Sequence, residues 1–338
     1  MSLSGLLSSL IQKIMRIAGI TRETETQQDG KKFIRVLSRW MLPVIFILWI
    51  VFLSFASPVF LTWGNLFNVT RQIAVIGILS VAQLLCILTG NIDLSIGAFL
   101  GLFGALLAGL SISMGFPMAF LICLVIAIAW GFTNGFLVTR GEGISVIVTL
   151  STMYVARGIT LIFTSGHPIV NFPMPFEFLG SGNLGPIPYN LIAFAIVLVA
   201  VLIILRYTPL GRHLYAVGGN KQAAKVCGIN TNKVTIGIFI TSSMLAALGS
   251  VILLGRVASA QPTAGTGMEM DSMATVLIGG ASMSGGRGGV ISTLIGVFML
   301  GFINNGLNLL GISGYWQYVF KGCIILVAVM VDLLKNRK

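Results

Sequence analysis

The stretch GGNKQAAKVCGIN (residues 218–230), followed by the apolar run VTIGIFITSSMLAALGS (residues 234–250), shows how the chain is built. A short, basic, polar turn ends one apolar segment, and a new apolar segment begins directly after it. A membrane-spanning helix needs about 20 mainly apolar residues, and the polar segments between such helices lie in water. The pattern therefore predicts membrane-spanning helices joined by aqueous turns.

The composition extends this prediction to the whole chain. Of the 338 residues, 56% are hydrophobic and only 9% are charged, which differs from the usual balance of a soluble domain. The net charge of +12 does not indicate nucleic-acid binding, because the sequence matches no known nucleic-acid-binding motif. The four cysteines are widely spaced and form neither a disulfide framework nor a zinc pattern. The sequence predicts an all-α polytopic membrane protein.

About ten apolar segments are candidates for spanning helices. They lie near residues 41–60, 73–90, 94–112, 117–138, 143–164, 188–206, 233–254, 272–284, 289–310 and 315–334. The 272–284 segment is too short to cross a bilayer, so we expect a broken or re-entrant element near residues 256–287. Small residues four positions apart, such as Gly97 with Gly101 and Gly131 with Gly135, predict close helix packing.

Two domains follow from these segments. Residues 41–338 form the predicted transmembrane domain. Residues 1–40 precede it, and the helical spacing of apolar residues in 1–20 predicts an amphipathic helix on the cytoplasmic leaflet, followed by a basic linker.

Basic residues predict the orientation in the membrane, because they accumulate on cytoplasmic loops. With a cytoplasmic N-terminus, one set of helix ends carries most Lys and Arg, whereas the other carries little more than Arg71 and Arg256. An even number of spans with both termini in the cytoplasm satisfies this distribution. The loop of about residues 207–232 is then cytoplasmic, and the Pro-rich loop of about residues 165–189 lies outside.

Enzymatic chemistry is not indicated. His167 lies in a predicted loop and His213 adjoins Arg212, so neither suggests a nucleophile–base pair or a metal cluster. A protein that hydrolyses ATP through a phosphate-binding loop would carry G-x-x-x-x-G-K-[ST]. The glycine runs VGGNKQ (217–222) and SGGRGG (284–289) do not match this motif. We therefore expect neither catalysis nor such a nucleotide site in this chain.

Three ionisable residues lie within apolar segments, namely Asp93, Arg157 and Lys321. A proton- or sodium-driven carrier would use groups of this kind. We expect Asp93 to cap a helix that begins at Leu94, and the two basic residues to be paired or to extend toward the membrane surface. Two bases and one acid are a weak basis for a proton relay.

The polar turn itself predicts a short capped helix. Asn220 is a good N-cap and Gly228 a good C′ residue, so residues 221–227 should form about two helical turns. One face carries small or apolar side chains, namely Ala223, Ala224, Val226 and Cys227. Such a helix suits insertion into a groove of another protein. The alternative is an ordinary surface helix that lies on the membrane.

Four stretches carry a resemblance to a known family. They are TGNIDLSIG (89–97), TPLGRHLYAVGGNKQAAKVCGIN (208–230), ASAQPTAGTGMEMDSMATVLIGGASMSGGRGG (258–289) and GFINNGLNLLGISGYWQ (301–317). Because these stretches occur in this order, the chain from about Pro43 onward resembles the membrane-spanning permeases of bacterial sugar-uptake ABC transporters of the ribose type.

The resemblance implies an inner-membrane transport subunit, not an enzyme, that translocates a ribose-like pentose or related monosaccharide. It implies a cytoplasmic ABC ATPase that binds ATP and magnesium, an extracytoplasmic sugar-binding protein, and a second permease copy or paralogue, all at the lipid bilayer. No cofactor is expected in this chain. The ATPase would engage the loop of about residues 207–232. The expected coupling residues are Gly219, Asn220, Lys221, Ala223, Ala224, Cys227 and Gly228.

Polar residues in or next to the apolar segments are candidates for lining the translocation path, and interhelical hydrogen bonding is their alternative role. They are Asn91, Asp93, Asn134, Gln261, Thr263, Asn304, Asn305 and Asn308. Two other functions stay open. One is an ABC permease for a furanose-type autoinducer, a nucleoside or a branched-chain amino acid, and the other is a stand-alone secondary carrier.

Overall fold

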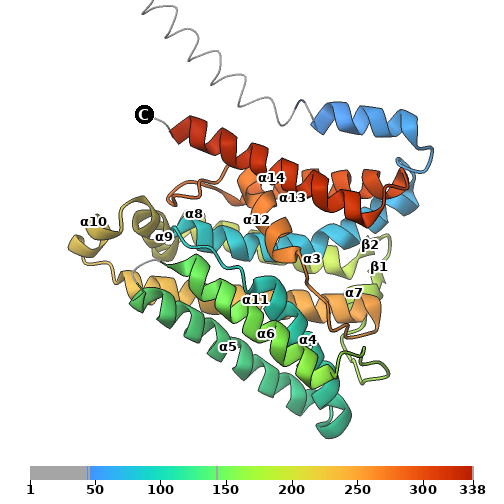
Figure 1. Cartoon of the computed structure of the whole chain (residues 1–338), viewed down its shortest axis with the longest axis horizontal. Helices are drawn as coiled ribbons and strands as arrows, with labels where there is room; N and C mark the ends of the chain where they lie inside the picture. Colours follow the sequence, from blue (N-terminus) through green and yellow to red (C-terminus); the bar gives the residue numbers. More distant parts are fainter. Residues whose placement is uncertain (1–43, 45, 142–143, 337–338) are drawn as a thin grey trace, which may run out of the picture. The chain divides into compact units, whose positions relative to one another are not determined.

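The computed structural model describes residues 44, 46–141 and 144–336. Internal contacts divide the chain into one unit of residues Leu53–Asp332 and another that comprises the two chain ends. The first unit is described below (Figure 1). The amphipathic helix predicted for residues 1–20 and the basic linker that follows it lie outside the described residues.

Helices make up most of the described chain (Figure 1). In sequence order they are α3 (Trp63–Leu88), α4 (Ile96–Met114), α5 (Phe116–Arg140), α6 (Ser145–Thr164), α7 (Phe178–Ser181), α8 (Tyr189–Tyr207), α9 (Pro209–Gly219), α10 (Lys221–Val226), α11 (Thr231–Val257), α12 (Met268–Ile278), α13 (Val290–Leu309) and α14 (Gly314–Asn336). Side-chain caps start several of them. The Thr62 hydroxyl accepts from the Asn65 N–H at α3, and the Thr208 hydroxyl accepts from the Gly211 N–H at α9.

Seven of the described helices are long and apolar enough to cross a membrane, so the expected count of about ten is not confirmed. They are α3, α4, α5, α6, α8, α11 and α13. The segment expected at 41–60 contains a shorter apolar helix, Phe46–Ala56. The segment expected at 272–284 overlaps α12, which has only 11 residues and lies between two non-helical stretches. The chain is a polytopic helical membrane protein with a short helix where a broken element was predicted.

A small β-hairpin departs from the all-α prediction. Strand β1 (Asn183–Leu184) pairs with β2 (Ile187–Pro188) in antiparallel register. Gly185 opens the two-residue turn between them with a φ of +60°, which glycine adopts without a steric penalty. The Pro and Gly content predicted a folded surface loop here, and strands of only two residues are too short to show an alternating pattern in the sequence.

Helix α3 forms the centre of the bundle, because its part from Ile73 to Leu88 is almost entirely apolar and nearly every residue there is buried. Helices α5, α6 and α8 instead expose many large apolar side chains, such as Val125, Ile162 and Ile196. An apolar exposed face of this kind suits contact with lipid. The core therefore lies around α3, and the outer helices surround it.

Glycines bring α5 and α11 into close contact. A methyl group at Gly131 would lie 2.5 Å from the Phe239 carbonyl oxygen and from the Ile240 Cα, and one at Gly135 would lie 2.7 Å from the Ile236 Cα. Backbones can approach this closely only where the side chain is absent. The predicted helix packing at these two glycines is confirmed.

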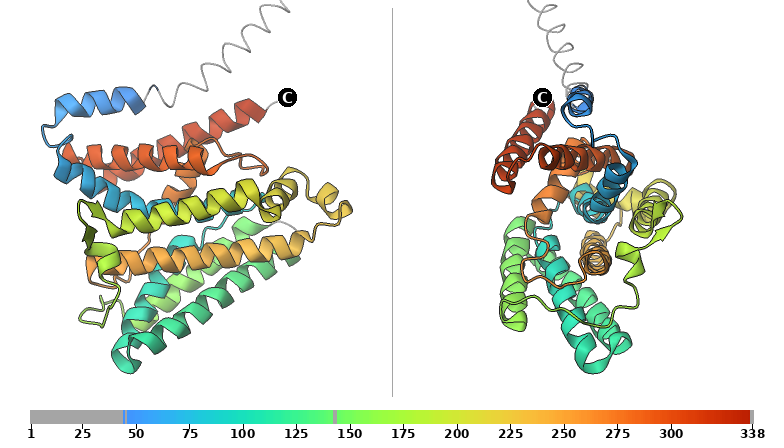
Figure 2. Two further views of the ribbon diagram at one scale, coloured as in Figure 1. Left: turned by 180° about the vertical axis from the view of Figure 1, so that it is seen from behind. Right: turned by 90° about the vertical axis from the view of Figure 1, so that its right-hand side faces the viewer.

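The bundle has two distinct ends. Figures 1 and 2 show α9 and α10 at one end and the β-hairpin with α7 at the other. Helix α8 runs between these ends and joins the hairpin to α9. The two segments that the sequence assigns to opposite membrane surfaces therefore lie at opposite ends of the helices.

Candidate functional site

Asp93 lies in the loop before α4 and is 3% exposed. Its Oδ1 accepts hydrogen bonds from the Ser95 backbone N–H at 3.0 Å and the Ser95 hydroxyl at 2.7 Å, and its Oδ2 accepts one from the Ser242 hydroxyl of α11 at 2.7 Å. The prediction that Asp93 caps a helix starting at Leu94 is wrong, because α4 begins at Ile96 and its N-cap is Ser95. Asp93 instead forms a side-chain turn with the residue two positions later.

The Ser95 hydroxyl extends these contacts to α5. It accepts a hydrogen bond from Asn134 Nδ2 at 2.9 Å and a longer one from Trp130 Nε1 at 3.4 Å. We call Asp93, Ser95, Asn134 and Ser242 the carboxylate cluster. All four residues are buried, and they link the start of α4 to α5 and α11. A buried carboxylate with this set of donors fixes the relative positions of three helices.

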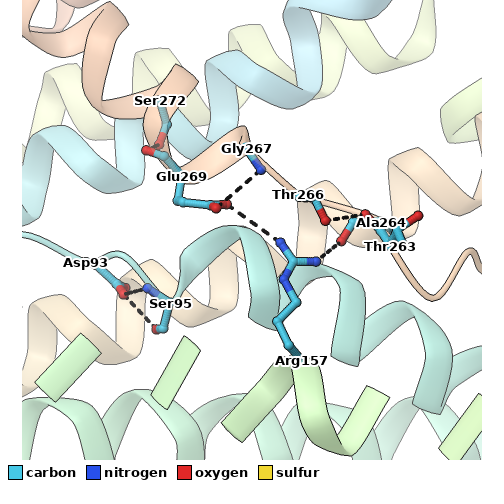
Figure 3. A network of polar contacts seen from close by, with 9 residues as sticks. All are labelled: Asp93, Ser95, Arg157, Thr263, Ala264, Thr266, Gly267, Glu269 and Ser272. Carbon is cyan, nitrogen blue, oxygen red and sulfur yellow. Dashed lines mark hydrogen bonds and ion pairs between the residues drawn. The ribbon is translucent and has the colours of Figure 1, made fainter. Parts of the chain in front are cut away.

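A second polar network joins α6 to the segment before α12 (Figure 3). Arg157 of α6 donates from Nη1 to the Ala264 carbonyl at 2.8 Å, and its Nη2 lies 3.8 Å from Glu269 Oε2. Glu269 Oε1 accepts from the Gly267 N–H at 3.2 Å. Arg157 Nη2 and Glu269 Oε2 are buried and make no hydrogen bond. Arg157 is thus paired with an acid, which was one of the two roles expected for it. It also holds the non-helical segment before α12 in place.

A third polar contact joins α14 to α12. Lys321 Nζ lies 2.7 Å from Asp271 Oδ2, and both side chains are mostly buried. Glu269 and Asp271 stand two positions apart on α12, so this short helix is held by bases from two different helices. Both bases were candidates from the sequence, whereas neither acid was predicted. The segment GMEMDS (267–272) contained the signal, since it supplies two acids to match two otherwise unpaired bases.

Gly97 and Gly101 of α4 lie against the segment before α12 and the first turn of that helix. A methyl group at Gly101 would lie 2.5 Å from the Ala264 carbonyl oxygen. One at Gly97 would overlap Glu269 Oε2 and lie 2.6 Å from the Gly265 carbonyl oxygen. Close packing was predicted correctly at both positions, but its partner is an irregular backbone segment. These glycines let the segment that carries the Arg157 contacts lie directly on α4.

The remaining path candidates do not gather with the carboxylate cluster. Asn91 is buried and donates to the Thr89 hydroxyl at 3.0 Å. Asn305 exchanges two hydrogen bonds, at 2.8 and 3.0 Å, with Asn65 of α3. The other four differ in exposure: Asn304 is half-buried, and Gln261, Thr263 and Asn308 are exposed. Asn134 and Asp93 are thus the two candidates that the structure joins through one shared partner.

Helix α10 follows the predicted capping. The Asn220 side chain accepts from the Ala223 N–H at 2.9 Å, Gly228 takes a φ of +83°, and Cys227 is the C-cap residue. The helix ends at Val226, one residue earlier than expected. Its faces also differ from the expectation, because only Ala224 is buried, at 4% exposed, whereas Val226 is 90% exposed.

Helix α10 therefore seats on the bundle through Ala224. The side chains of Ala223, Val226 and Cys227 are exposed, and those of Gln222 and Lys225 are exposed as well. The small or apolar face expected to insert into a partner is thus available on the surface of the described chain. Neighbouring Lys221 is half-buried, and Gly219 is exposed.

Comparison with known proteins agrees with this architecture. A family described as "Branched-chain amino acid transport system / permease component" matches residues 65–329. The ribose import permease protein of Bacillus subtilis is 40% identical over 94% of this chain and 99% of its own. The Escherichia coli K12 ribose import permease protein is 41% identical, over 85% and 91% respectively.

A more distant relative names another sugar. The xylose transport system permease protein of Haemophilus influenzae is 30% identical over 88% of this chain and 96% of its own. No solved structure matches the chain. The family match and these near-complete alignments confirm the resemblance seen in the sequence: the chain belongs to this family of transport permease components and is a ribose-type ABC permease.

Proposed function

We propose that this chain is the membrane-spanning permease subunit of an ABC importer for a ribose-like pentose or related monosaccharide. One observation carries the proposal, namely its 40% identity to a ribose import permease over 99% of that protein's length. The relatives are transport permeases, so the chain transports and is not an enzyme. ATP and magnesium bind to a separate subunit.

The ATPase subunit docks on the cytoplasmic end that carries α9 and α10. Support comes from the exposed small side chains of Ala223 and Cys227 and from the caps at Asn220 and Gly228, which hold α10 in a fixed conformation. Lys221 and Gly219 border this surface, and Ala224 anchors the helix beneath it. Movement of the ATPase is then delivered to the permease through α10.

The sugar-binding protein docks at the opposite end, where the β-hairpin and α7 lie (Figure 1). This arrangement is supported by the position of the hairpin at the far end of α8 from α9. A second copy or paralogue of the permease completes the path across the inner membrane. Both termini lie in the cytoplasm in this orientation.

Alternating access requires a polar region between the helices that changes its exposure. We propose the carboxylate cluster and the Arg157–Glu269 contact as the parts of this chain nearest that region. Both lie against α4 and involve Asp93 and Glu269, buried acids in an apolar bundle (Figure 3). Ionisable residues buried among membrane helices are expensive to maintain and commonly belong to transport paths.

The proposal is tested by uptake of radiolabelled ribose into proteoliposomes that contain the permease, its ATPase and the binding protein. We expect ATP-dependent uptake that unlabelled ribose suppresses fully. Competition by unlabelled xylose shows whether the importer accepts several pentoses or ribose alone. Uptake of leucine in place of ribose would contradict the sugar assignment.

A branched-chain amino acid is the second candidate substrate, because the matched family is named for it. The two ribose import permeases are 40% and 41% identical to this chain over 99% and 91% of their own lengths, so the amino acid is the secondary candidate. The solute retained by the purified binding protein separates the two. A bound aldopentose supports the proposal, and a bound aliphatic amino acid favours the alternative.

A further inference from the structure

Three backbone segments meet without intervening side chains at the end of the bundle that carries α9. They are Leu88–Gly90 at the end of α3, Gly218–Gly219 at the end of α9, and Gly285–Gly286 between α12 and α13. The Gly286 N–H donates to the Leu88 carbonyl at 3.0 Å. A methyl group at Gly218 would overlap that same carbonyl oxygen and lie 2.5 Å from the Gly286 nitrogen. We call these three segments the glycine junction.

Gly285 and Gly286 also lie too close to neighbouring backbone atoms to carry a side chain without a shift. A methyl group at Gly285 would lie 2.8 Å from the Gly90 nitrogen and 2.9 Å from the Gly218 carbonyl oxygen. One at Gly286 would lie 2.9 Å from the Gly219 Cα. Gly90, Gly285 and Gly286 also have φ values of +75°, +85° and +70°, which suit glycine. The three segments therefore contact one another backbone to backbone.

A fourth contact ties α9 to the same loop. The Tyr215 hydroxyl donates to the Gly288 carbonyl at 2.9 Å. Burial raises the pKa of Tyr215, so the phenol stays protonated and keeps this donor. Tightly packed groups pass a displacement to their neighbours because the contact has little free volume to absorb it.

Each segment of the junction leads to a functional part of the chain. Gly218 and Gly219 directly precede the Asn220 cap of α10. Gly90 lies three positions before Asp93 of the carboxylate cluster. Gly286 lies between α12, which carries Glu269 and Asp271, and α13. The junction is thus the place where α9, the loop before α4 and the loop before α13 come into contact.

We propose that the glycine junction transmits displacement of α10 to the loop that carries Asp93 and to the α12–α13 segment, so that ATPase movement reaches the polar region of the path. This inference rests on the proposed function. It assigns a positioning role to VGGN (217–220) and SGGRGG (284–289), two glycine motifs whose spacing does not match a phosphate-binding loop. Gly218 and Gly286 position other residues and do not touch the transported solute.

The test is Gly218→Ala in the complete importer, reconstituted in proteoliposomes. The added methyl overlaps the Leu88 carbonyl and disrupts the contacts of the junction, while no residue of α10 is substituted. We expect normal recovery of the ATPase subunit, continued ATP hydrolysis, and a fall of about tenfold in solute imported per ATP hydrolysed. Gly237→Ala is the matched control, because its methyl meets nothing within 4 Å in α11. This control should keep the wild-type ratio.

Tyr215→Phe provides a second variant that adds no volume and removes only the hydrogen bond to Gly288. We expect a smaller fall in the amount of solute imported per ATP hydrolysed. If Gly218→Ala does not fold, the result for Tyr215→Phe tests the proposal alone. A wild-type ratio of solute to ATP in both variants would overturn the proposed role of the junction and leave the importer assignment intact. Loss of ATPase binding in Gly218→Ala would also overturn it, since the defect would then be docking. Absence of ATP-driven uptake in the wild type would instead refute the proposed function.

Discussion

Replacing Asp93 tests whether the carboxylate cluster holds the helices together. Asp93→Leu removes the acceptor for three buried hydrogen bonds, two from Ser95 and one from Ser242. A buried donor that loses its acceptor costs about 1–3 kcal/mol. The expected loss in the free energy of unfolding is therefore about 3–9 kcal/mol, which is comparable to the whole stability of many domains.

Asp93→Asn should behave differently. The amide oxygen can keep both hydrogen bonds from Ser95, and the amide nitrogen can donate to Ser242 if that hydroxyl turns to accept. Hydrogen bonds between neutral groups are weaker than those to a carboxylate, so we expect a loss of about 1–3 kcal/mol. Denaturant unfolding of the purified permease in detergent measures both variants.

The size of the Asp93→Leu effect separates two physical accounts. A carboxylate that only capped a helix would cost about 1 kcal/mol on removal. If Asp93→Leu and Ser242→Ala each lowered the free energy of unfolding by no more than about 1 kcal/mol, the cluster would be refuted as a structural unit. Coupling between Asp93→Asn and Ser242→Ala of about 0.5–3 kcal/mol in a double-mutant cycle supports it.

Three further predictions concern other parts of the molecule. Gly131→Leu should prevent close packing of α5 on α11 and sharply lower the yield of folded protein, measured by size-exclusion chromatography; a normal yield would contradict the packing described. A single cysteine at Ser181, which is exposed, should react with an impermeant thiol reagent in intact cells, and labelling only after lysis would reverse the proposed orientation. Ala223→Trp should weaken ATPase co-purification by a docking penalty of about 1–3 kcal/mol without lowering permease expression, and Lys225→Gln is its control. Equal ATPase recovery in both would remove α10 from the docking surface.

Local signals in the sequence were sufficient for features that depend on neighbouring residues. Asn220 and Gly228 bracket α10 as predicted, because capping is decided within a few positions. The close approach of α5 at Gly131 also followed from local spacing. The start of α4 was misplaced because Asp93 and Ser95 are both good capping residues. In the folded chain Ser95 donates both its N–H and its hydroxyl to Asp93, and the helix begins after Ser95.

Contacts between distant segments could not be predicted in the same way. Arg157 pairs with Glu269 and Lys321 with Asp271 across large separations in sequence, and no local pattern specifies which acid meets which base. Asp93 likewise meets Ser242 of α11 through tertiary packing. The glycine motif at 284–289 could be excluded as a nucleotide loop from its spacing, but its contact with Gly218 became visible only in the fold.

The energy source of transport tests the central claim most directly. Proteoliposomes that hold the permease, its ATPase and the binding protein should import labelled ribose only when ATP can be hydrolysed, and uptake should persist after ionophores abolish proton and sodium gradients. Uptake that continues without the ATPase and collapses with the proton gradient would contradict the account, and would identify the chain as a stand-alone carrier.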